Sequence, residues 1–194
     1  HFWVHVPPDG GESLPLILAF HAGGTGALAF AKNSGLNKMA DKEGYVVLYP
    51  EGTEVLSNRR LWHSEHCCDP VFNVNDVRFI RVLLNSSKEK LKIDQNRIYA
   101  VGLSNGGMMV HKIAAELGDR LAAAAVIAGT VGGQWRGRHE HNVTPEHPVA
   151  SVPMLIMHGK RDVNVPFGGG ESTDQNRVDL SMSDSVDYWV ETNQ

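Results

Sequence analysis

Short apolar runs rich in β-branched residues recur along the chain and are separated by segments of helical periodicity. After the first run they are near-continuous rather than alternating with polar residues, which is typical of strands buried on both faces of a parallel sheet. The runs occupy Phe2–Val6, Leu16–His21, Tyr45–Tyr49, Arg97–Leu103, Ala123–Ile127 and Met154–His158.

The segments between these runs place apolar residues at helical spacing. A helix over Phe30–Glu43 would end at Gly44, a residue suited to the cap after a helix. Another over Asn75–Leu91 carries an acidic residue in its first turn. Two more are predicted over 106–117 and 183–192. Strand and helix alternating in this way predict an α/β fold with a mostly parallel, doubly wound sheet.

The composition is that of an ordinary globular domain, with 42% of the 194 residues hydrophobic and 21% charged. The formal net charge is −4 and no Lys/Arg-rich block occurs, so we expect no nucleic-acid partner. No apolar run approaches the ~18 residues of a membrane-spanning helix, so we expect no membrane partner. Residues 129–150 are predicted to form a long loop, and such loops are usually functional or mobile.

Both ends of the chain look cut. The sequence starts at His1 beside an apolar run already under way, so neither a start codon nor a signal peptide is visible. It stops just after the helix predicted at 183–192. We find no internal repeat and no linker, and expect residues 1–194 to form a single domain that is truncated at both ends.

A glycine-rich stretch joins the run that ends at Leu103 to the helix that begins at Gly106. Residues 102–106 satisfy the Gly-x-Ser-x-Gly pattern, in which the serine lies on a sharp strand-to-helix turn with its hydroxyl exposed. The N-terminus of the following helix offers positive potential to a developing oxyanion. The pattern predicts that Ser104 is the nucleophile of an α/β-hydrolase fold. The alternative is a glycine-rich turn in which Ser104 caps the helix.

The partners of this serine are expected in the order Ser, then Asp or Glu, then His. Asp162 follows the run Met154–His158, and doubly wound sheets build their sites at the carboxyl ends of strands, so we predict Asp162 as the triad acid. The oxyanion hole would take one amide from Asn105. The second would come from the glycine-rich loop after the second run, with Gly23 the first choice and Ala22 the next.

The general base is not assigned to a residue, because none of the ten histidines follows Asp162. His158 lies four residues before Asp162 and is expected to tie down its loop. Loop histidines 139 and 141 are spaced like metal ligands, but no carboxylate or cysteine constellation supports them, so we predict no metal. The catalytic histidine and the last strand are expected beyond Gln194. The histidines that would serve only in an unusual chain order are His63, His66, His139, His141 and His147.

Several other motifs accompany the elbow. They are Pro15–Leu18 leading into His21–Gly24, Tyr49–Gly52, Trp62 followed by Cys67-Cys68, Asn75–Ile80, Ile93-Asp94 before Arg97–Tyr99, Gly102–Met109, and His158-Gly159 with Asp162 and Val165-Pro166. Together they resemble the polyhydroxybutyrate depolymerase/feruloyl esterase branch of the α/β-hydrolases, a group of secreted esterases that also includes acetylxylan esterase-like members. The resemblance covers nearly the whole chain.

This resemblance implies serine-dependent hydrolysis of carboxylic esters through an acyl-enzyme, without a cofactor, in a secreted or periplasmic protein. The esters would be of polyhydroxyalkanoate, feruloyl or acetyl-polysaccharide type. Ser104 would be the nucleophile and Asp162 the acid. The histidine of the family has no counterpart here, so residues 1–194 alone are expected to be nearly inactive. Ala22 stands where the family usually has glycine, and Asn75 and Arg78 depart from its Asp-rich motif.

Cys67 and Cys68 are adjacent, and neighbours in sequence rarely bond each other. They are either reduced thiols or partners of cysteines outside this chain, which would indicate an oxidising compartment. The resemblance favours the second, because members often carry a further cysteine soon after the segment that matches Tyr188–Gln194.

Two other functions stay open, a serine peptidase of the same fold and a non-catalytic binding protein of hydrolase fold. The aromatic residues Trp62, Trp135 and Phe167 either line an acyl pocket or pack in the core and the loops.

Overall fold

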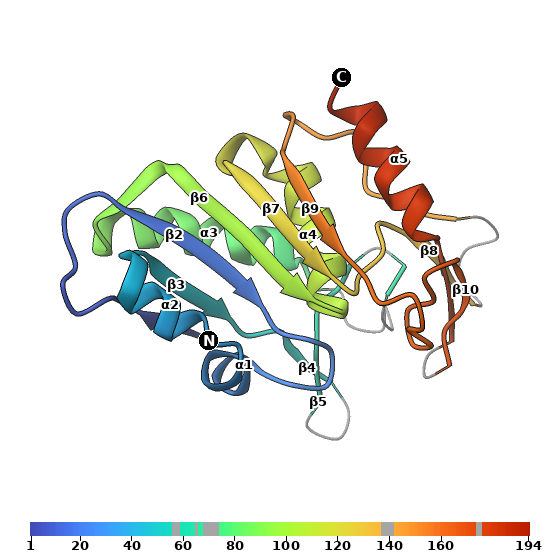
Figure 1. Ribbon diagram of the computed structural model, residues 1–194, viewed down its shortest axis with the longest axis horizontal. Coiled ribbons are helices and arrows are strands. Elements are labelled where there is room, and N and C mark those ends of the chain that lie inside the picture. The colour runs from blue at the N-terminus through green and yellow to red at the C-terminus, as the bar shows by residue number, and fades with distance from the viewer. Residues whose placement is uncertain (56–58, 65, 68–73, 137–141, 174–175) are drawn as a thin grey trace.

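A six-stranded sheet forms the centre of the computed structural model (Figure 1), which describes residues 1–55, 59–64, 66–67, 74–136, 142–173 and 176–194. The strand order is β1-β3-β2-β6-β7-β9. β1 is antiparallel to β3, and all other neighbours are parallel. The six apolar runs each form one of these strands, which confirms the predicted sheet. The bounds are Phe2–His5 (β1), Leu14–Phe20 (β2), Val46–Pro50 (β3), Ile93–Leu103 (β6), Ala123–Ile127 (β7) and Met154–Met157 (β9).

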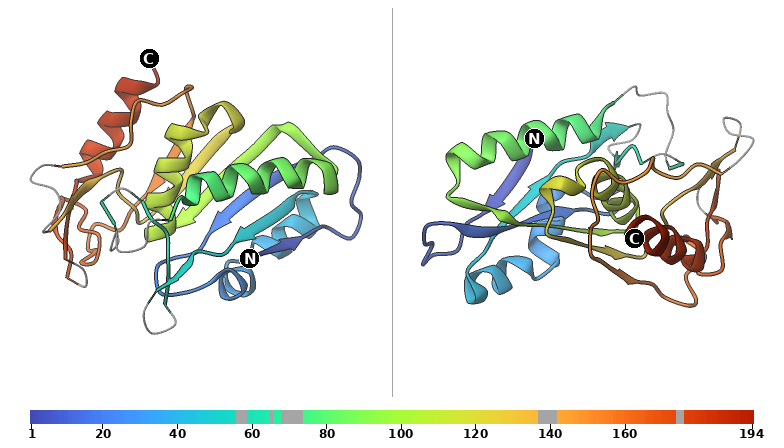
Figure 2. Two further views of the ribbon diagram at one scale, coloured as in Figure 1. Left: turned by 180° about the vertical axis from the view of Figure 1, so that it is seen from behind. Right: turned by 90° about the horizontal axis from the view of Figure 1, so that it is seen from above.

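Helices cover both faces of this sheet (Figure 2), as a doubly wound fold requires. The side chains of α1 and α2 pack on one face, and those of α3 and α4 pack on the other. α5 lies beside α4 at the β9 end of the sheet. The bounds are Ala27–Asn33 (α1), Leu36–Glu43 (α2), Asp76–Lys90 (α3), Asn105–Glu116 (α4) and Met182–Thr192 (α5), with a short 3₁₀ turn at Gly118–Arg120.

The central strand β2 explains why the apolar runs are continuous. Leu16, Leu18 and Phe20 are buried in the cluster beneath α3 and α4. Ile17 and Ala19 belong to the cluster beneath α1 and α2. Successive side chains of a strand point to opposite faces. A strand that lies between two layers of helices therefore needs an apolar residue at every position.

The helix predicted over 30–43 is wrong in one respect, because it is two helices. The helical conformation is interrupted at Gly35, whose φ of 76° places it in the left-handed region, and α2 starts at the next residue. Glycine adopts this conformation at little steric cost. The predicted end is confirmed, since Gly44 has φ 75° and its N–H donates to the carbonyl of Ala40. Asn75 caps α3 by accepting from the N–H of Arg78 at 2.8 Å.

Two small sheets lie in the connections that follow the carboxyl ends of the main strands. One is the hairpin of β4 (Thr53–Val55) and β5 (Arg59–Leu61), and the other has the order β10-β11-β8. The prediction of 129–150 as loop is therefore partly wrong, because β8 lies within it. These added strands are β8 (Gly133–Trp135), β10 (Gly170–Glu171) and β11 (Arg177–Asp179). Within the described residues, none of the helices has the length and apolar character that crossing a membrane requires.

Candidate active site

Ser104 lies at the tight junction between β6 and α4. Its φ of 54° and ψ of −121° form a strained conformation that non-glycine residues seldom adopt. The backbone holds it on both sides. Its N–H donates to the carbonyl of Ile127 at 2.8 Å, and its own carbonyl accepts from the N–H of Met108 at 2.9 Å. The Ser104 side chain makes no capping hydrogen bond, so the alternative of a serine cap does not describe this turn.

The glycines of the elbow are required by the close approach of two backbone segments. A Cβ on Gly102 would lie 2.2 Å from the carbonyl oxygen of Gly106. A Cβ on Gly106 would lie 2.4 Å from the carbonyl oxygen of Phe20 and 2.5 Å from that of His21. Both distances are far below a van der Waals contact. The missing side chains thus allow α4 to start against the end of β2.

The loop after β2 brings Gly23 beside the elbow. A Cβ on Gly23 would lie 3.3 Å from Cβ of Asn105. The neighbouring N–H of Gly24 donates to the carbonyl of Arg60 at 2.8 Å, whereas that of Gly23 has no backbone acceptor among the described residues. The two residues predicted for the oxyanion hole, Gly23 and Asn105, are therefore neighbours. Ala22, the second choice, uses its carbonyl to accept from Thr25.

A buried histidine supports this loop from below. His21 Nε2 accepts from the N–H of Gly52 at 3.0 Å, and Nδ1 lies 2.8 Å from the carbonyl of Ala22. Burial lowers the pKa of His21 from its ordinary value. A neutral ring is needed, because Nε2 must keep its lone pair to accept from Gly52. His21 therefore fixes the loop rather than exchanging protons with substrate.

The Asn105 side chain anchors the elbow to the segment after β5. Its Oδ1 accepts from the N–H of Trp62 at 2.7 Å, and its Nδ2 donates to the carbonyl of the same residue at 3.0 Å. The Trp62 ring is fully buried and lies edge-on to Phe20. Of the two alternatives for Trp62, lining an acyl pocket or packing in the core, the structure shows the second.

Ser104 opens into a polar cavity of about 120 Å³. The Ser104 hydroxyl makes no hydrogen bond to the described part of the chain, so it is available to a ligand. Trp135 and Phe167 do not line this cavity, and the Phe167 ring lies against His158 instead. The lining residues are Gly23, Arg59, Ser104, Asn105, Met108, Asn164, Ser172 and Arg177.

Asp162 lies on the loop after β9, the strand end at which it was predicted. Its Oδ1 accepts from the N–H groups of Asn164 and Val165 at 2.9 and 3.0 Å. Asp162 itself is not among the residues that line the cavity, but Asn164 of the same loop is. The expectation for His158 is confirmed, because its Nε2 contacts the carbonyl of Val165 at 2.7 Å and ties down this loop.

The described histidines do not supply a base for Ser104. His66 is buried, with Nε2 3.2 Å from Oδ1 of Asp179. His63 binds Asp76 through its backbone N–H. His147 is exposed in the segment that reaches the far end of α4, ~18 Å along the helix from Ser104. His139 and His141 lie outside the described residues. In the described ranges, no group of three His, Cys, Asp or Glu is arranged to hold a metal.

Sequence reasoning missed Arg177, which is only 3% exposed and lines the Ser104 cavity. Its Nε donates to Oδ1 of Asp179 at 2.7 Å. No motif marks Arg177, and the only local sign is its alternation with Asp179 in a short strand. Cys67, which it also contacts, is disulfide-bonded. The alternative of a reduced thiol is therefore wrong for Cys67, and Cys68 lies outside the described residues.

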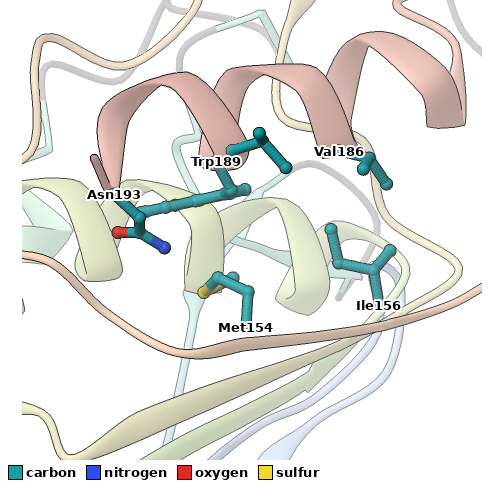
Figure 3. A pocket seen from close by; sticks show the side chains of 6 residues that line it. Met154, Ile156, Val186, Trp189 and Asn193 are labelled. Atoms are coloured by element: carbon teal, nitrogen blue, oxygen red, sulfur yellow. The ribbon is translucent and has the colours of Figure 1, made fainter.

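Another hollow lies between β9 and α5 (Figure 3). Its volume is about 370 Å³. It offers no nucleophile and no charged group, so it is not a candidate active site. Its lining residues are Met154, Ile156, Val186, Trp189, Val190 and Asn193.

Comparison with known proteins agrees with this geometry. The family described as "Esterase PHB depolymerase" matches residues 2–142, which is most of the chain and includes the elbow. The chain belongs to this family. This finding confirms the family resemblance that the motifs predicted.

Two relatives in this esterase group are similar over most of the chain. "Putative esterase NocK" of Nocardia uniformis subsp. tsuyamanensis is 30% identical over 81% of this chain and 43% of its own length. "Feruloyl esterase B" of Thermothelomyces thermophilus is 29% identical over 75% of this chain and 49% of its own length. The chain thus spans less than half the length of these curated relatives.

Solved structures establish the fold. The Bacillus cereus carboxylesterase superposes with a TM-score of 0.64 at 18% identity, covering 99% of this chain and 80% of that one. The chain has the α/β-hydrolase fold that was predicted, with its mostly parallel, doubly wound sheet.

Proposed function

We propose that the protein is a carboxylic ester hydrolase in which Ser104 is the nucleophile. One observation carries the proposal: a strained serine at the junction of β6 and α4 opens into a cavity beside Gly23 and Asn105. Glycine-flanked serines on such turns present Oγ to substrate above the sheet. Family membership and the esterase names of the relatives support the same reaction class.

The reaction would proceed in two acyl-transfer steps. Ser104 Oγ attacks the ester carbonyl, a base takes the hydroxyl proton, and that proton leaves with the alcohol. Water then attacks the acyl-enzyme, which releases the acid and restores the serine. The amides of Gly23 and Asn105 would hold the oxyanion in both steps. Asp162 would orient the base and stabilise its charged form. The base itself stays a prediction.

The size of the cavity supports a short acyl group. About 120 Å³ is well below the ~300–1,000 Å³ of pockets that enclose a drug-sized ligand. The aromatic residues that would suit a feruloyl ring pack elsewhere. We therefore propose acetyl esters, such as those of acetylated polysaccharides, ahead of feruloyl esters and polyhydroxyalkanoates.

The decisive experiment compares Ser104→Ala with Ser183→Ala in the full-length protein. Ser183 is an exposed serine on α5. With p-nitrophenyl acetate as substrate, we expect S104A to lose ~10⁴- to 10⁶-fold in kcat/KM and S183A to lose nothing. Methyl ferulate and a peptide panel complete the test. Cleavage of peptides favours a serine peptidase, and inactivity of the wild type towards every ester favours a binding protein.

The position of the base gives a further test. Residues 1–194 alone should hydrolyse p-nitrophenyl acetate far more slowly than the full-length protein, because no described histidine contacts Ser104. Equal rates would mean that a histidine within this chain serves as the base.

We also propose that the protein works in an oxidising compartment, secreted or periplasmic. The disulfide of Cys67 supports this, since such bonds persist there and are rare in the cytosol. Peptide mass mapping of the natively produced protein without reductant should find Cys67 oxidised. A free Cys67 thiol would contradict the assignment.

A further inference from the structure

A buried ion pair lies next to the Ser104 cavity. Arg177 and Asp179 on β11 are each 3% exposed, and Nε of Arg177 donates to Oδ1 of Asp179 at 2.7 Å. Asp179 is also approached by the ring of His66 at 3.2 Å. Burying two charges is expensive, and such pairs often add nothing to stability compared with apolar residues. The other contacts of the Arg177 guanidinium therefore indicate the role of this pair better than its effect on stability does.

One arm of the guanidinium reaches the loop of the proposed triad acid. Nη2 of Arg177 donates to the carbonyl of Asn164 at 3.0 Å. The N–H of the same Asn164 donates to Oδ1 of Asp162 at 2.9 Å. The peptide segment that fixes the Asp162 carboxylate is thus clamped by Arg177. Thr173 gives a second hold, because its hydroxyl donates to Oδ1 of Asn164 at 2.8 Å.

The other arm is connected to the nucleophile elbow through Cys67. Nη1 of Arg177 lies 3.8 Å from Sγ of Cys67. The side-chain amide of Asn105 donates to the same sulfur at 3.4 Å. Asn105 is the residue after Ser104 and the first residue of α4. The guanidinium therefore connects two loops that are about 60 residues apart in sequence but must keep a fixed separation for a triad to work.

We propose that Arg177 is a positioning residue that holds the Asp162 loop at its working distance from the Ser104 elbow. This inference rests on the proposed roles of Ser104 and Asp162. Arginine suits the task because its planar fork donates in several fixed directions at once, whereas a lysine ammonium cannot reproduce that geometry. Asp179 accepts from Nε, whereas the contacts of Nη1 and Nη2 with Cys67 and Asn164 lie on two other segments.

The test is Arg177→Gln in the full-length protein, with p-nitrophenyl acetate as substrate. A displaced acid slows the chemical steps without removing a substrate contact. We therefore expect kcat to fall ~10- to 100-fold with KM unchanged, the scale set by a misplacement of ~1 Å. The matched control is Arg97→Gln. Arg97 makes an ion pair of the same 2.7 Å with Asp94 but is exposed, and it lies seven residues before Ser104 on β6, ~23 Å away.

Two further variants keep the proposal testable if R177Q does not fold. Arg177→Lys retains the charge next to Asp179, and we expect a folded protein with lowered kcat. Thr173→Val changes an exposed residue and removes the second hold on Asn164, so kcat should fall ~2- to 10-fold, the value of one hydrogen bond. Wild-type kcat in folded R177Q or R177K overturns the proposal.

The kinetic pattern separates this inference from the proposed function. A raised KM with unchanged kcat in R177Q would make Arg177 a substrate contact, which overturns the positioning role. If Asp162→Asn is inactive but R177Q keeps wild-type kcat, the positioning role alone fails. If D162N and S104A both keep full activity, the proposed function fails instead.

Discussion

The Ser104 cavity and the groove between β9 and α5 differ in size and chemistry, and the smaller of these two hollows is the candidate active site. The Ser104 cavity, of about 120 Å³, is lined by guanidinium, amide and hydroxyl groups from five separate segments. The groove between β9 and α5, of about 370 Å³, is lined almost wholly by apolar side chains. The capacity for chemistry thus follows the convergence of polar groups and not the available volume.

Their positions in the sheet explain the difference. The cavity lies where β2 and β6 end, and the loops at the carboxyl ends of parallel strands bring distant residues together. The groove runs along β9, the last strand in the described sheet order. The side chains there pack between β9 and α5 and carry no reactive groups. Val190 on α5, which lines the groove, is 56% exposed, so part of this apolar surface is uncovered.

The largest expected effect concerns the acid on the cavity side. Asp162→Asn keeps an oxygen that accepts from the N–H of Asn164 but removes the charge, so kcat should fall ~10⁴-fold. Asp94→Asn is the matched control, because Asp94 accepts from the N–H of Asn96 at the same 2.9 Å. Steady-state kinetics with p-nitrophenyl acetate measure both. Equal activity of the two variants would remove Asp162 from the mechanism.

The next effect compares a buried and an exposed residue of the groove by their contributions to stability. Trp189 is 3% exposed and donates from Nε1 to Nδ1 of His111 at 2.8 Å. Trp189→Ala should lower the free energy of unfolding by ~3–5 kcal/mol. Val190→Ala, one residue along α5, should change it by less than ~0.5 kcal/mol. Urea unfolding of both variants decides this, and similar losses would mean that the exposed wall is also packed.

A smaller effect is expected at the elbow. Gly106→Ala would place a methyl group 2.4 Å from the carbonyl of Phe20, so we expect a loss of ~3 kcal/mol in unfolding free energy. A Cβ on Gly159, after β9, would meet nothing within 4 Å. Gly159→Ala should therefore leave the stability unchanged. A stable, active G106A would mean that the backbones beneath the cavity can separate.

The smallest effect is a pH dependence from His111, which lies behind the groove. Burial lowers the pKa of His111 to about 3. Below pH ~6.5 the unfolded chain therefore binds a proton at His111 that the folded state does not bind. The free energy of unfolding decreases as the pH falls from ~6.5 towards the folded-state pKa of about 3. Between pH 6.5 and 5 one such histidine costs ~2 kcal/mol. In His111→Gln the difference in unfolding free energy between pH 7 and 5 should shrink by that amount; an unchanged difference would point to other groups, such as His21.

The nucleophile side of the candidate site was predictable from the sequence, and the arginine side was not. Ser104, Asn105 and Gly23 follow strand ends, and glycines beside them mark the close approach of backbones. Arg177 carries no such mark. Its contacts lie 13 and 110 residues away in the sequence, and the short strand that holds it has no hydrophobic periodicity to reveal it. The break of the first predicted helix at Gly35 was also missed, because one glycine within a helical pattern is often tolerated.

The sequence by itself determined the six strands of the main sheet and their alternation with helices, the elbow at Ser104 and the family. These features depend on local periodicity and on glycines at fixed offsets, which are properties of neighbours in the chain. Only the tertiary structure decided that Asn105 anchors Trp62, that Arg177 contacts both Asn164 and Cys67, and that the larger of the two hollows is lined mostly by apolar side chains. Those outcomes depend on which distant side chains meet when the sheet assembles, and burial and pairing between remote residues leave no periodic trace in the sequence.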